Sequence, residues 1–467
     1  MFGMAKVALD TQARYRQMTE RSIPGLVSSL ALPTTLSQLI TVVYNTADTY
    51  FVSQLGKSAA AAVGVVFSFM SIIQACGFSI GMGCSSLVSR KLGAGENDAA
   101  ARFASSAFAF AAVIGGLLML LGLGFSRPLM RLLGASESTM PYALTYAVYI
   151  FAGAPVMCSA FVLNALLRAE GEAVFAMVGL CSGGLLNIVL DPLLIFRFKM
   201  GVAGAALATV LSQVLSFLIL FSFFASGKSL VTLRRKQVST QPSDYLLILS
   251  TGFPTLCRQS MASVATAAIN VRARVYGDAA VAAITIANKL YLLVRNIILG
   301  IGQGFQPVAG YNYGAKLYRR VRQAFWFAVA LGTSVCVLMT LLLLTGAEGV
   351  LGWFIRDADV VRIGALSLRL ACCVMPLMAY STYVNQLYQC LGYRTAATLL
   401  ALCRQGILFF PLIAVLPQLW GLFGIQLSQP GADGLTFLVS VPFQIVFMRR
   451  VLRDGAAESP NISAKKP

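Results

Sequence analysis

Long apolar runs recur along almost the whole of this 467-residue chain. Each run is long enough to cross about 30 Å of hydrocarbon at about 1.5 Å per helical residue. Helices are expected because a helix satisfies its own backbone polar groups where no water is present. The composition agrees, since 58% of residues are hydrophobic, 11% are charged and the mean hydropathy is +0.77, outside the range of a soluble domain. We therefore predict an all-α polytopic membrane protein.

The runs predict about twelve spanning helices with no soluble domain between them. Each has at least the roughly 20 residues that a crossing requires. The predicted spans are 24–52, 59–83, 104–125, 141–165, 174–196, 202–225, 246–271, 279–305, 324–346, 364–390, 395–416 and 420–447.

The two halves of the chain repeat each other. Residues 33–95 and 254–316 align without a gap at an offset of 221 residues, and the same offset takes Asn164 to Asn385. Two unrelated apolar stretches would match Leu and Ala by chance, rather than Pro, Gln and loop Gly. Because six crossings return the chain to its starting side, we predict two parallel six-helix bundles related by a pseudo-two-fold axis along the membrane normal. The matched pairs include Pro33 and Pro254, Gln38 and Gln259, Gly56 and Gly277, Gly171 and Gly392 and, with one-residue shifts, Cys181 and Cys403, Gly201 and Gly421.

The positions of the basic residues predict the orientation. With the N-terminus inside, cytoplasmic segments hold 22 of the 36 Lys and Arg residues, outer loops hold 9 and the spans hold 5. Both termini are therefore expected in the cytoplasm of a bacterial inner (plasma) membrane protein. The predicted domains are a cytoplasmic amphipathic lead-in over 1–22, an N-terminal lobe over 23–228, a cytoplasmic linker over 229–244, a C-terminal lobe over 245–449 and a cytoplasmic polar tail over 450–467.

Composition also excludes several functions. The net charge of +19 is explained by topology and anionic lipid, so it predicts no nucleic-acid partner. The chain has no histidine, its ten cysteines are scattered, and no Gly-rich nucleotide loop is present. We therefore predict neither an enzyme nor a bound cofactor, and any proton coupling must use carboxylates.

Two prolines lie at equivalent places in the repeat. Pro33 and Pro254 fall inside the first helix of each half, where a missing N–H and a ring clash bend a helix. They are predicted hinges; the alternative is that they are among the prolines that membrane helices generally tolerate.

Carboxylates inside a span are costly, by about 2.5–3.5 kcal/mol on insertion scales, and each is a functional hypothesis. Asp48 lies near the outer end of the first span, and Asp191 near the outer end of the fifth. Asn187 precedes Asp191 by four residues and shares its helical face. Thr209 returns to a similar depth in the sixth span, about 10 Å inward.

These four side chains form a predicted cation-coupling site, because hard oxygen ligands suit Na⁺ and a close carboxylate pair has raised proton affinity. Either ion could couple, and the four residues are the possible Na⁺ ligands. The alternative is a solvated, structural role at the interface. The second half has Ile269 and Leu412 or Ile413 at the corresponding positions, which predicts a site in one lobe only.

The second half instead carries basic residues in its spans. The only carboxylate in these predicted spans is Asp433. Lys289 and Arg295 could line a cavity and attract an anionic group or repel the coupling cation. The alternative is that these residues extend to an interface or pair with Asp433 or helix carbonyls. The basic residues are Arg258, Lys289, Arg295, Arg369 and Arg404.

Several motifs resemble those of multidrug and toxic compound extrusion (MATE) transporters of bacteria, over nearly the whole chain. The resemblance implies two six-helix bundles in a V, alternating access, and Na⁺- or H⁺-driven efflux of amphipathic, often cationic compounds. It implies a cation site at Asp48, Asn187, Asp191 and Thr209, with Asn164 as a neighbouring cavity residue. Second-lobe glutamates that some branches use are replaced by basic residues. The motifs are 44–49 (YNTADT), 164–171 (NALLRAEG), 187–192 (NIVLDP), 302–307 (GQGFQP) and 310–315 (GYNYGA).

We predict a secondary active antiporter that exports drugs or metabolites in exchange for H⁺ or Na⁺, working as a monomer in the lipid bilayer. The alternative is a flippase or exporter of lipid-linked or phosphate-bearing precursors. The substrate cavity is assigned to Tyr44, Asn164, Gln38, Gln259, Lys289 and Arg295.

Overall fold

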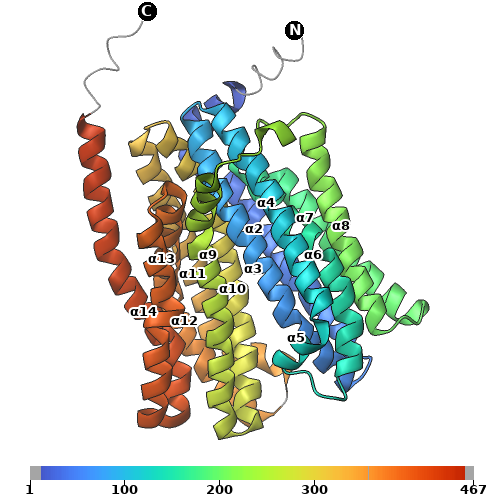
Figure 1. Cartoon of the computed structure of the whole chain (residues 1–467). Helices are drawn as coiled ribbons and strands as arrows, with labels where there is room; N and C mark the ends of the chain where they lie inside the picture. The colour runs from blue at the N-terminus through green and yellow to red at the C-terminus, as the bar shows by residue number, and fades with distance from the viewer. Residues whose placement is uncertain (1–11, 356, 458–467) are drawn as a thin grey trace, which may run out of the picture. The chain divides into compact units, whose positions relative to one another are not determined.

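The computed structural model describes residues 12–355 and 357–457, and helices account for nearly all of them (Figure 1). No strand occurs in these two ranges, so the predicted all-α class is confirmed. Of the predicted lead-in and tail, residues 1–11 and 458–467 lie outside the described part, while 12–20 are helical. The elements are α2 (Ile23–Ser53), α3 (Lys57–Gly93), α4 (Asn97–Gly124), α5 (Ser126–Leu132), α6 (Met140–Ala169), α7 (Ala173–Pro192), η1 (Leu193–Arg197), α8 (Val202–Ala225), η2 (Arg235–Gln237), α9 (Pro242–Ala273), η3 (Arg274–Tyr276), α10 (Asp278–Gly314), α11 (Tyr318–Phe354), α12 (Ala358–Leu391), α13 (Arg394–Leu402), η4 (Cys403–Ile407) and α14 (Phe409–Ala457).

Ten helical segments of the described chain are long and apolar enough to cross a membrane. The last of them, Arg394–Arg449, has 56 residues and would be about 84 Å long, which is far more than one crossing needs. Gly421 interrupts it with a non-helical backbone, so it supplies two crossings. The 32-residue α9 is also long enough to cross, but it carries Arg258 and Gln259 among its apolar residues. Counted this way, the helices match the twelve predicted spans.

The repeat is present in the backbone itself. Gly201, before α8, has φ 56° and ψ −131°, and its repeat partner Gly421 has φ 59° and ψ −134°. L side chains are strained at such positive φ values. Glycine at both positions therefore lets each half make the same turn before its last helix.

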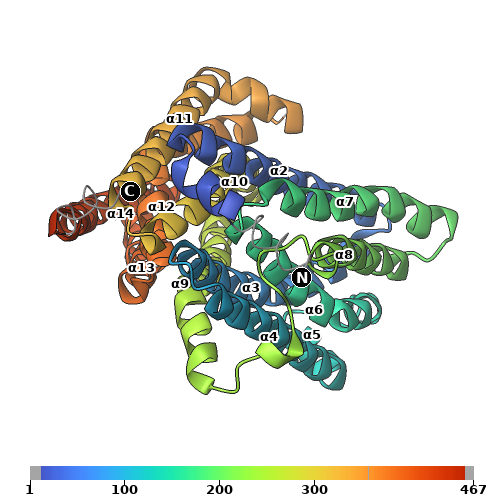
Figure 2. The same ribbon diagram turned by 90° about the horizontal axis from the view of Figure 1, so that it is seen from above.

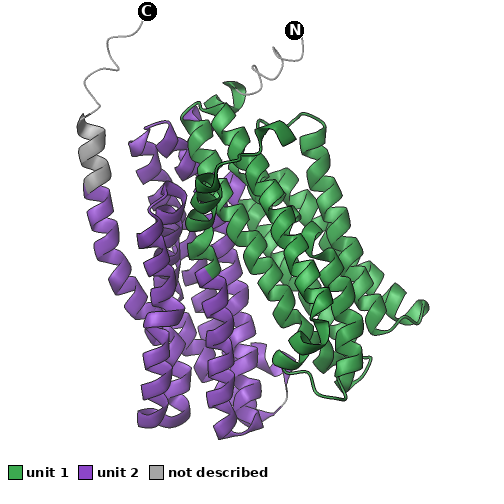
Figure 3. Cartoon of the chain, in the orientation of Figure 1, with its two compact units in different colours: residues 1–16, 32–256 green, residues 17–31, 257–467 purple. Residues whose placement is uncertain are grey.

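The chain divides into two compact units (Figure 3). Unit 1 comprises Met1–Arg16 and Leu32–Leu256, and unit 2 comprises Gln17–Ala31 and Cys257–Pro467. The helix α2 therefore changes unit at residues 31 and 32, beside Pro33, and α9 does so at residues 256 and 257, beside Pro254. Each first helix of the repeat is thus shared between units at its proline.

Close backbone packing holds the shared helix ends. In unit 1, a Cβ at Gly83 of α3 would lie 2.8 Å from the Gly252 nitrogen of α9. In unit 2, a Cβ at Gly304 of α10 would lie 2.7 Å from the Leu30 carbonyl carbon of α2. Gly83 and Gly304 are repeat partners. Only glycine permits this approach, so both halves use it to receive the start of a first helix.

One helix forms the centre of unit 1. The helix α6 packs against α3, α4 and α8 (Figure 2), and α7 packs on α8. In the most apolar window of α6, 78% of residues are buried, more than in any other candidate span of the described chain. Its repeat counterpart α12 packs against α10, α11 and α14 in unit 2. Residues on α2, α6, α7 and α8 can therefore meet inside unit 1.

Candidate functional site

The four residues of the predicted cation site are all buried in unit 1. Asp48 lies on α2, Asn187 and Asp191 lie on α7, and Thr209 lies on α8. Their exposed fractions are 7%, 3%, 0% and 6% in that order. None of the ion pairs formed by the described residues includes either carboxylate. Two acids are thus held out of water without a protein cation.

Local backbone features bring α7 and α8 together at this site. Asp191 is followed by Pro192, the π-helical turn η1 and the positive-φ Gly201 that begins α8. A Cβ at Gly204 would lie 2.8 Å from the Leu194 carbonyl oxygen. The absence of a side chain there lets the start of α8 fold back onto the end of α7. This hairpin places Thr209 near Asp191.

The four side chains share one neighbourhood, since the charges of Asp48 and Asp191 both act on Tyr146, which also lies beside Thr209. The Asn187 amide nitrogen donates to Asp191 Oδ1 at 3.3 Å, and the Thr209 hydroxyl donates to the Ala205 carbonyl at 3.1 Å. The charge of Asp48 acts directly on Asp191. The structure therefore brings together the residues that the sequence placed at one depth; their role in coupling stays a prediction.

Sequence reasoning missed Tyr146, a central member of this cluster. It lies on α6, is 1% exposed, and is close to Thr209 and to both carboxylates. Its hydroxyl, Asp48 Oδ1 and Asp191 Oδ2 are all buried with no hydrogen-bond partner among the described residues. Nothing distinguishes it in the sequence from the other 15 of the chain's 16 tyrosines, because only the packing of α6 reveals its position.

The unpartnered oxygens decide what the cluster can hold. A buried oxygen without a donor costs free energy until a donor or a cation reaches it. Two carboxylates, a hydroxyl and an amide provide hard oxygen ligands for Na⁺ and a place for a proton. Among the described residues, no group of three or more His, Cys, Asp or Glu is arranged to hold a metal ion.

The predicted substrate-cavity residues are divided between the units. Gln38, Tyr44 and Asn164 belong to unit 1, while Gln259, Lys289 and Arg295 belong to unit 2. Both glutamines are half-buried on the shared helices α2 and α9. Half-buried Tyr44 packs beside α7, where a Cβ at Gly184 would lie 2.8 Å from its ring. The cavity assignment itself stays a prediction.

Asn164 and Asn385 make equivalent bonds in the two units. The side-chain amide of Asn164 donates to the Ala176 carbonyl at 2.9 Å, and that of Asn385 donates to the Ala397 carbonyl at 2.6 Å. Each amide oxygen accepts from an arginine, Arg168 in unit 1 and Arg258 in unit 2. These amides tie the end of the fourth helix of each repeat to the start of the fifth.

A buried charged cluster lies in unit 2. Arg404 Nε contacts Asp433 Oδ1 at 2.7 Å, and the Arg404 guanidinium donates to the Tyr291 hydroxyl at 2.6 Å. The Tyr291 hydroxyl donates to Asp433 Oδ2 at 2.5 Å. All three side chains are less than 9% exposed. The predicted pairing of a span arginine with Asp433 is therefore met by Arg404, whereas sequence reasoning missed Tyr291.

The other basic residues of the unit 2 spans differ in setting. Arg295 is 7% exposed and belongs with this cluster, since its charge acts on Arg258 and is acted on by Arg404. Lys289 is exposed on α10. Arg369 is half-buried, with its side chain 42% exposed, and pairs with Glu348 at 3.0 Å. Of the basic residues in the predicted spans of unit 2, only Arg295 and Arg404 are thus buried.

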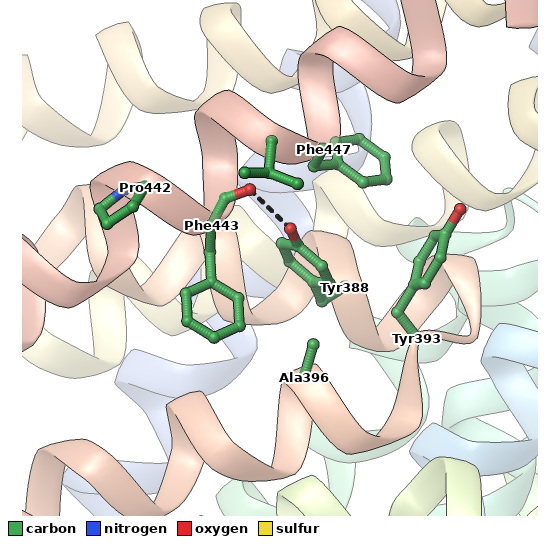
Figure 4. Close-up of a pocket in the computed structure, with 7 residues that line it drawn as sticks. Tyr388, Tyr393, Ala396, Pro442, Phe443 and Phe447 are labelled. Atoms are coloured by element: carbon green, nitrogen blue, oxygen red, sulfur yellow. Dashed lines mark hydrogen bonds between the residues drawn. The ribbon is translucent and has the colours of Figure 1, made fainter.

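Two cavities of unit 2 lie apart from all of these residues. One of about 340 Å³ is lined by Tyr388, Tyr393, Phe443 and Phe447, with the Tyr388 hydroxyl donating to the Phe443 carbonyl at 2.7 Å (Figure 4). The other, of about 670 Å³, borders the start of α11 and includes three arginines. Neither contains a predicted site residue.

Comparison with known proteins matches both repeats. The MatE family model matches residues 33–193 and again residues 254–415. The chain is 26% identical to the multidrug export protein MepA of Staphylococcus saprophyticus over 91% of this chain and 94% of that protein. It is 27% identical to MepA of Staphylococcus aureus over 90% and 92%. A solved structure described as MATE in complex with MaL6 has a TM-score of 0.89 at 25% identity, covering 94% of this chain and 99% of that one.

Proposed function

Because the chain belongs to the MatE family of membrane transporters, we propose that it is a secondary active antiporter that exports small amphipathic molecules in exchange for H⁺ or Na⁺. The MepA relatives are described as multidrug export proteins, and we infer the same broad task here. The observation that carries the coupling proposal is the pair of buried carboxylates, Asp48 and Asp191, with unpartnered oxygens.

Electrostatics gives these carboxylates a reason to bind a cation. When both are ionised, their repulsion and their burial disfavour the charged pair. A proton on either acid, or Na⁺ between them, relieves both penalties at once. The Tyr146 hydroxyl and Thr209 lie within the same cluster and can orient around the bound ion. Cation binding therefore selects a conformation in which these oxygens converge.

Coupling requires that the ion and the exported molecule favour different conformations. We assign the bending to Pro33 and Pro254, because α2 and α9 change unit beside these residues. Each proline lacks the N–H that would close the helix ladder, so the helix can bend there with a smaller loss of hydrogen bonding. Asp48 lies on α2 beyond Pro33, which links cation binding to the bend.

Proteoliposomes with separate Na⁺ and pH gradients test the proposal. The vesicles would contain 1-naphthylmethylammonium or 1-naphthoate, which share an aromatic ring and differ in charge. We expect one gradient to accelerate export, and Asp191→Asn to abolish that acceleration because the coupling ion loses its ligand. The matched control is Asp278→Asn, which removes an exposed carboxylate at the start of α10. Export that neither gradient accelerates, or that Asp191→Asn leaves intact, contradicts antiport.

The same vesicles separate the hinge and the alternative function. Pro33→Ala should slow driven export while the cation still raises the melting temperature; unchanged export would remove Pro33 from the mechanism. If the chain instead moves lipid-linked precursors, a fluorescent phosphate-bearing lipid would change leaflet and neither naphthyl compound would be exported.

We place the chain in the bacterial inner membrane as a monomer with cytoplasmic termini. The accessibility of terminal tags in intact cells would check the side on which the termini lie, and light scattering would check the monomeric state.

A further inference from the structure

Three arginines and one carboxylate meet inside unit 2. Arg404 has its charge paired, because its Nε bonds to Asp433 and its Nη2 bonds to Tyr291. Gln429 also donates to Asp433, at 3.2 Å. Asp433 therefore has its negative charge satisfied by Arg404 and neutral donors. The charges of the other two arginines remain to be accounted for.

Arg295 and Arg258 have donor capacity left over. Arg295 is 7% exposed, and its Nε is buried with no hydrogen-bond partner among the described residues. Arg258, which is half-buried, makes one long bond of 3.3 Å to the neutral Asn385 oxygen. Both guanidinium groups repel each other, and both lie within the field of Arg404. The cluster thus carries an excess of two positive charges.

Such an excess is costly inside a membrane protein. A buried guanidinium stays charged, because its pKa is too high for it to release the proton at neutral pH. Buried charges are normally paired, and one left unpaired destabilises the fold. An oxyanion would supply the missing partner, since the planar guanidinium fork matches a carboxylate or a phosphate with two parallel hydrogen bonds.

We propose that Arg295 and Arg258, positioned by the Arg404–Asp433–Tyr291 network, bind the oxyanion group of an amphipathic substrate. The inference rests on the proposed export function and names its substrate class as organic anions. Arg295 is the primary contact because its buried Nε lacks an acceptor, and half-buried Arg258 completes the pair. Arg404 is a positioning residue, because its Nε and Nη2 are already bonded to Asp433 and Tyr291.

An anionic substrate changes the electrical balance of the exchange. One organic anion leaving for one cation entering moves two positive charges inward. A potential that is negative inside should then accelerate export. Exchange of a monovalent cationic substrate for one coupling cation moves no net charge, so the same potential would have little effect on its rate. The potential therefore reports the charge of the substrate directly.

Equilibrium binding to the full-length protein in detergent tests the site without any gradient. The probes are 1-naphthoate, 1-naphthyl phosphate, 1-naphthylmethylammonium and neutral 1-naphthylmethanol, measured by calorimetry. We expect an anionic probe to bind at least about tenfold more tightly than the neutral or cationic one. The two anionic arms distinguish a carboxylate from a phosphate substrate. Equal or weaker binding of both anions overturns the proposal in the wild-type protein itself.

Matched variants locate the site. Arg295→Gln should weaken binding of the anionic probe by about 10- to 100-fold, and Arg295→Lys should restore part of it. Arg272→Gln removes the same charge from an exposed position on α9, the helix that also carries Arg258, and should change binding by less than about twofold. Equal losses in Arg295→Gln and Arg272→Gln would show a general charge effect and overturn the site.

The variant Asp191→Asn separates this inference from the proposed antiport. It should lose gradient-driven export and still bind the anionic probe as the wild type does. Anion binding that survives while neither gradient drives transport leaves the site standing and removes antiport. If a gradient drives export of the cationic naphthyl compound and the anionic probes do not bind selectively, antiport stands and the anion site is ruled out.

Discussion

The carboxylate cluster of unit 1 and the arginine cluster of unit 2 lie in two copies of one fold, yet they have opposite charge. Unit 1 buries Asp48 and Asp191 without a cationic partner. Unit 2 gathers buried Arg295 and Arg404 and half-buried Arg258 near the single carboxylate of Asp433. The helices, the turns and the bonds of Asn164 and Asn385 repeat, whereas the buried charges do not. The same helical scaffold therefore carries buried charge of opposite sign in its two halves.

The clusters also occupy different positions within the repeat. The unit 2 counterparts of Asp48 and Asp191 include Ile269 and Ile413, which are 5% and 4% exposed in one hydrophobic core with Phe409. The unit 1 counterparts of Tyr291 and Arg295 are Met70 and Gln74, which are uncharged. Each unit thus fills with neutral side chains the region where the other holds its charges. Two charged sites of opposite sign can then titrate or bind without sharing a helix bundle.

The largest effect expected from breaking this asymmetry comes from Arg404. Arg404→Met leaves Asp433 buried and uncompensated, and it also removes a partner of Tyr291. We expect a loss of about 3–5 kcal/mol of unfolding free energy, measured by denaturation in mixed micelles. The double variant Arg404→Met with Asp433→Leu should recover most of the loss, because it removes both desolvated charges.

The exposed pair formed by Arg369 and Glu348 gives the control for that prediction. Its side chains are 42% and 65% exposed, so Arg369→Met should cost about 0–1 kcal/mol. If Arg404→Met is no more costly than Arg369→Met, the ion pair is not a buried structural element, and the positioning role of Arg404 falls with it.

Removing a charge from the carboxylate cluster of unit 1 should stabilise the protein, whereas removing the charge of Arg404 should destabilise it. Asp48 has an unpartnered buried oxygen, so Asp48→Asn removes a charge that the fold does not compensate. We expect unfolding free energy to rise by about 1–3 kcal/mol in a buffer without sodium. Sodium should raise the melting temperature of the wild type by mass action and leave that of Asp48→Asn unchanged. A destabilised variant would mean that Asp48 is satisfied in the folded state.

The sequence predicted the scaffold well because the membrane imposes strong local constraints. Apolar runs and repeated prolines and glycines identified the helices, and Gly201 and Gly421 proved to have the same backbone conformation. Asp48 and Asp191 were identifiable because a carboxylate in an apolar span is rare. Tyr146 and Tyr291 were not, because a tyrosine is compatible with both lipid and core. Their partners come from helices more than 40 residues away in the chain, and only packing brings them together.

Another buried carboxylate, Glu170, lies outside the spans and shows what a partnered acid does in this fold. It is 1% exposed in the turn between α6 and α7. Its oxygens accept the Ser229 hydroxyl at 2.6 Å and the Leu230 N–H at 3.0 Å. Burial raises the pKa of Glu170 from 4.5 to about 7, although these bonds and the nearby Arg14 charge oppose that shift. Hydrogen-bond donors therefore reach the Glu170 carboxylate, but the cost of burying its charge outweighs them and raises its pKa.

The smallest effect expected is the pH dependence that Glu170 confers. The folded protein keeps a proton that the unfolded chain releases above pH 4.5, so this stabilisation is complete below pH 4.5 and is lost as pH rises through about 7. Wild-type unfolding free energy should fall by about 1 kcal/mol from pH 6 to 8 through this group. Glu170→Gln should remove that slope, whereas Glu137→Gln, which alters an exposed side chain, should keep it. A slope that persists in Glu170→Gln would assign the titration to another acid, and the carboxylates of unit 1 would be the first to test, by repeating the series in Asp48→Asn.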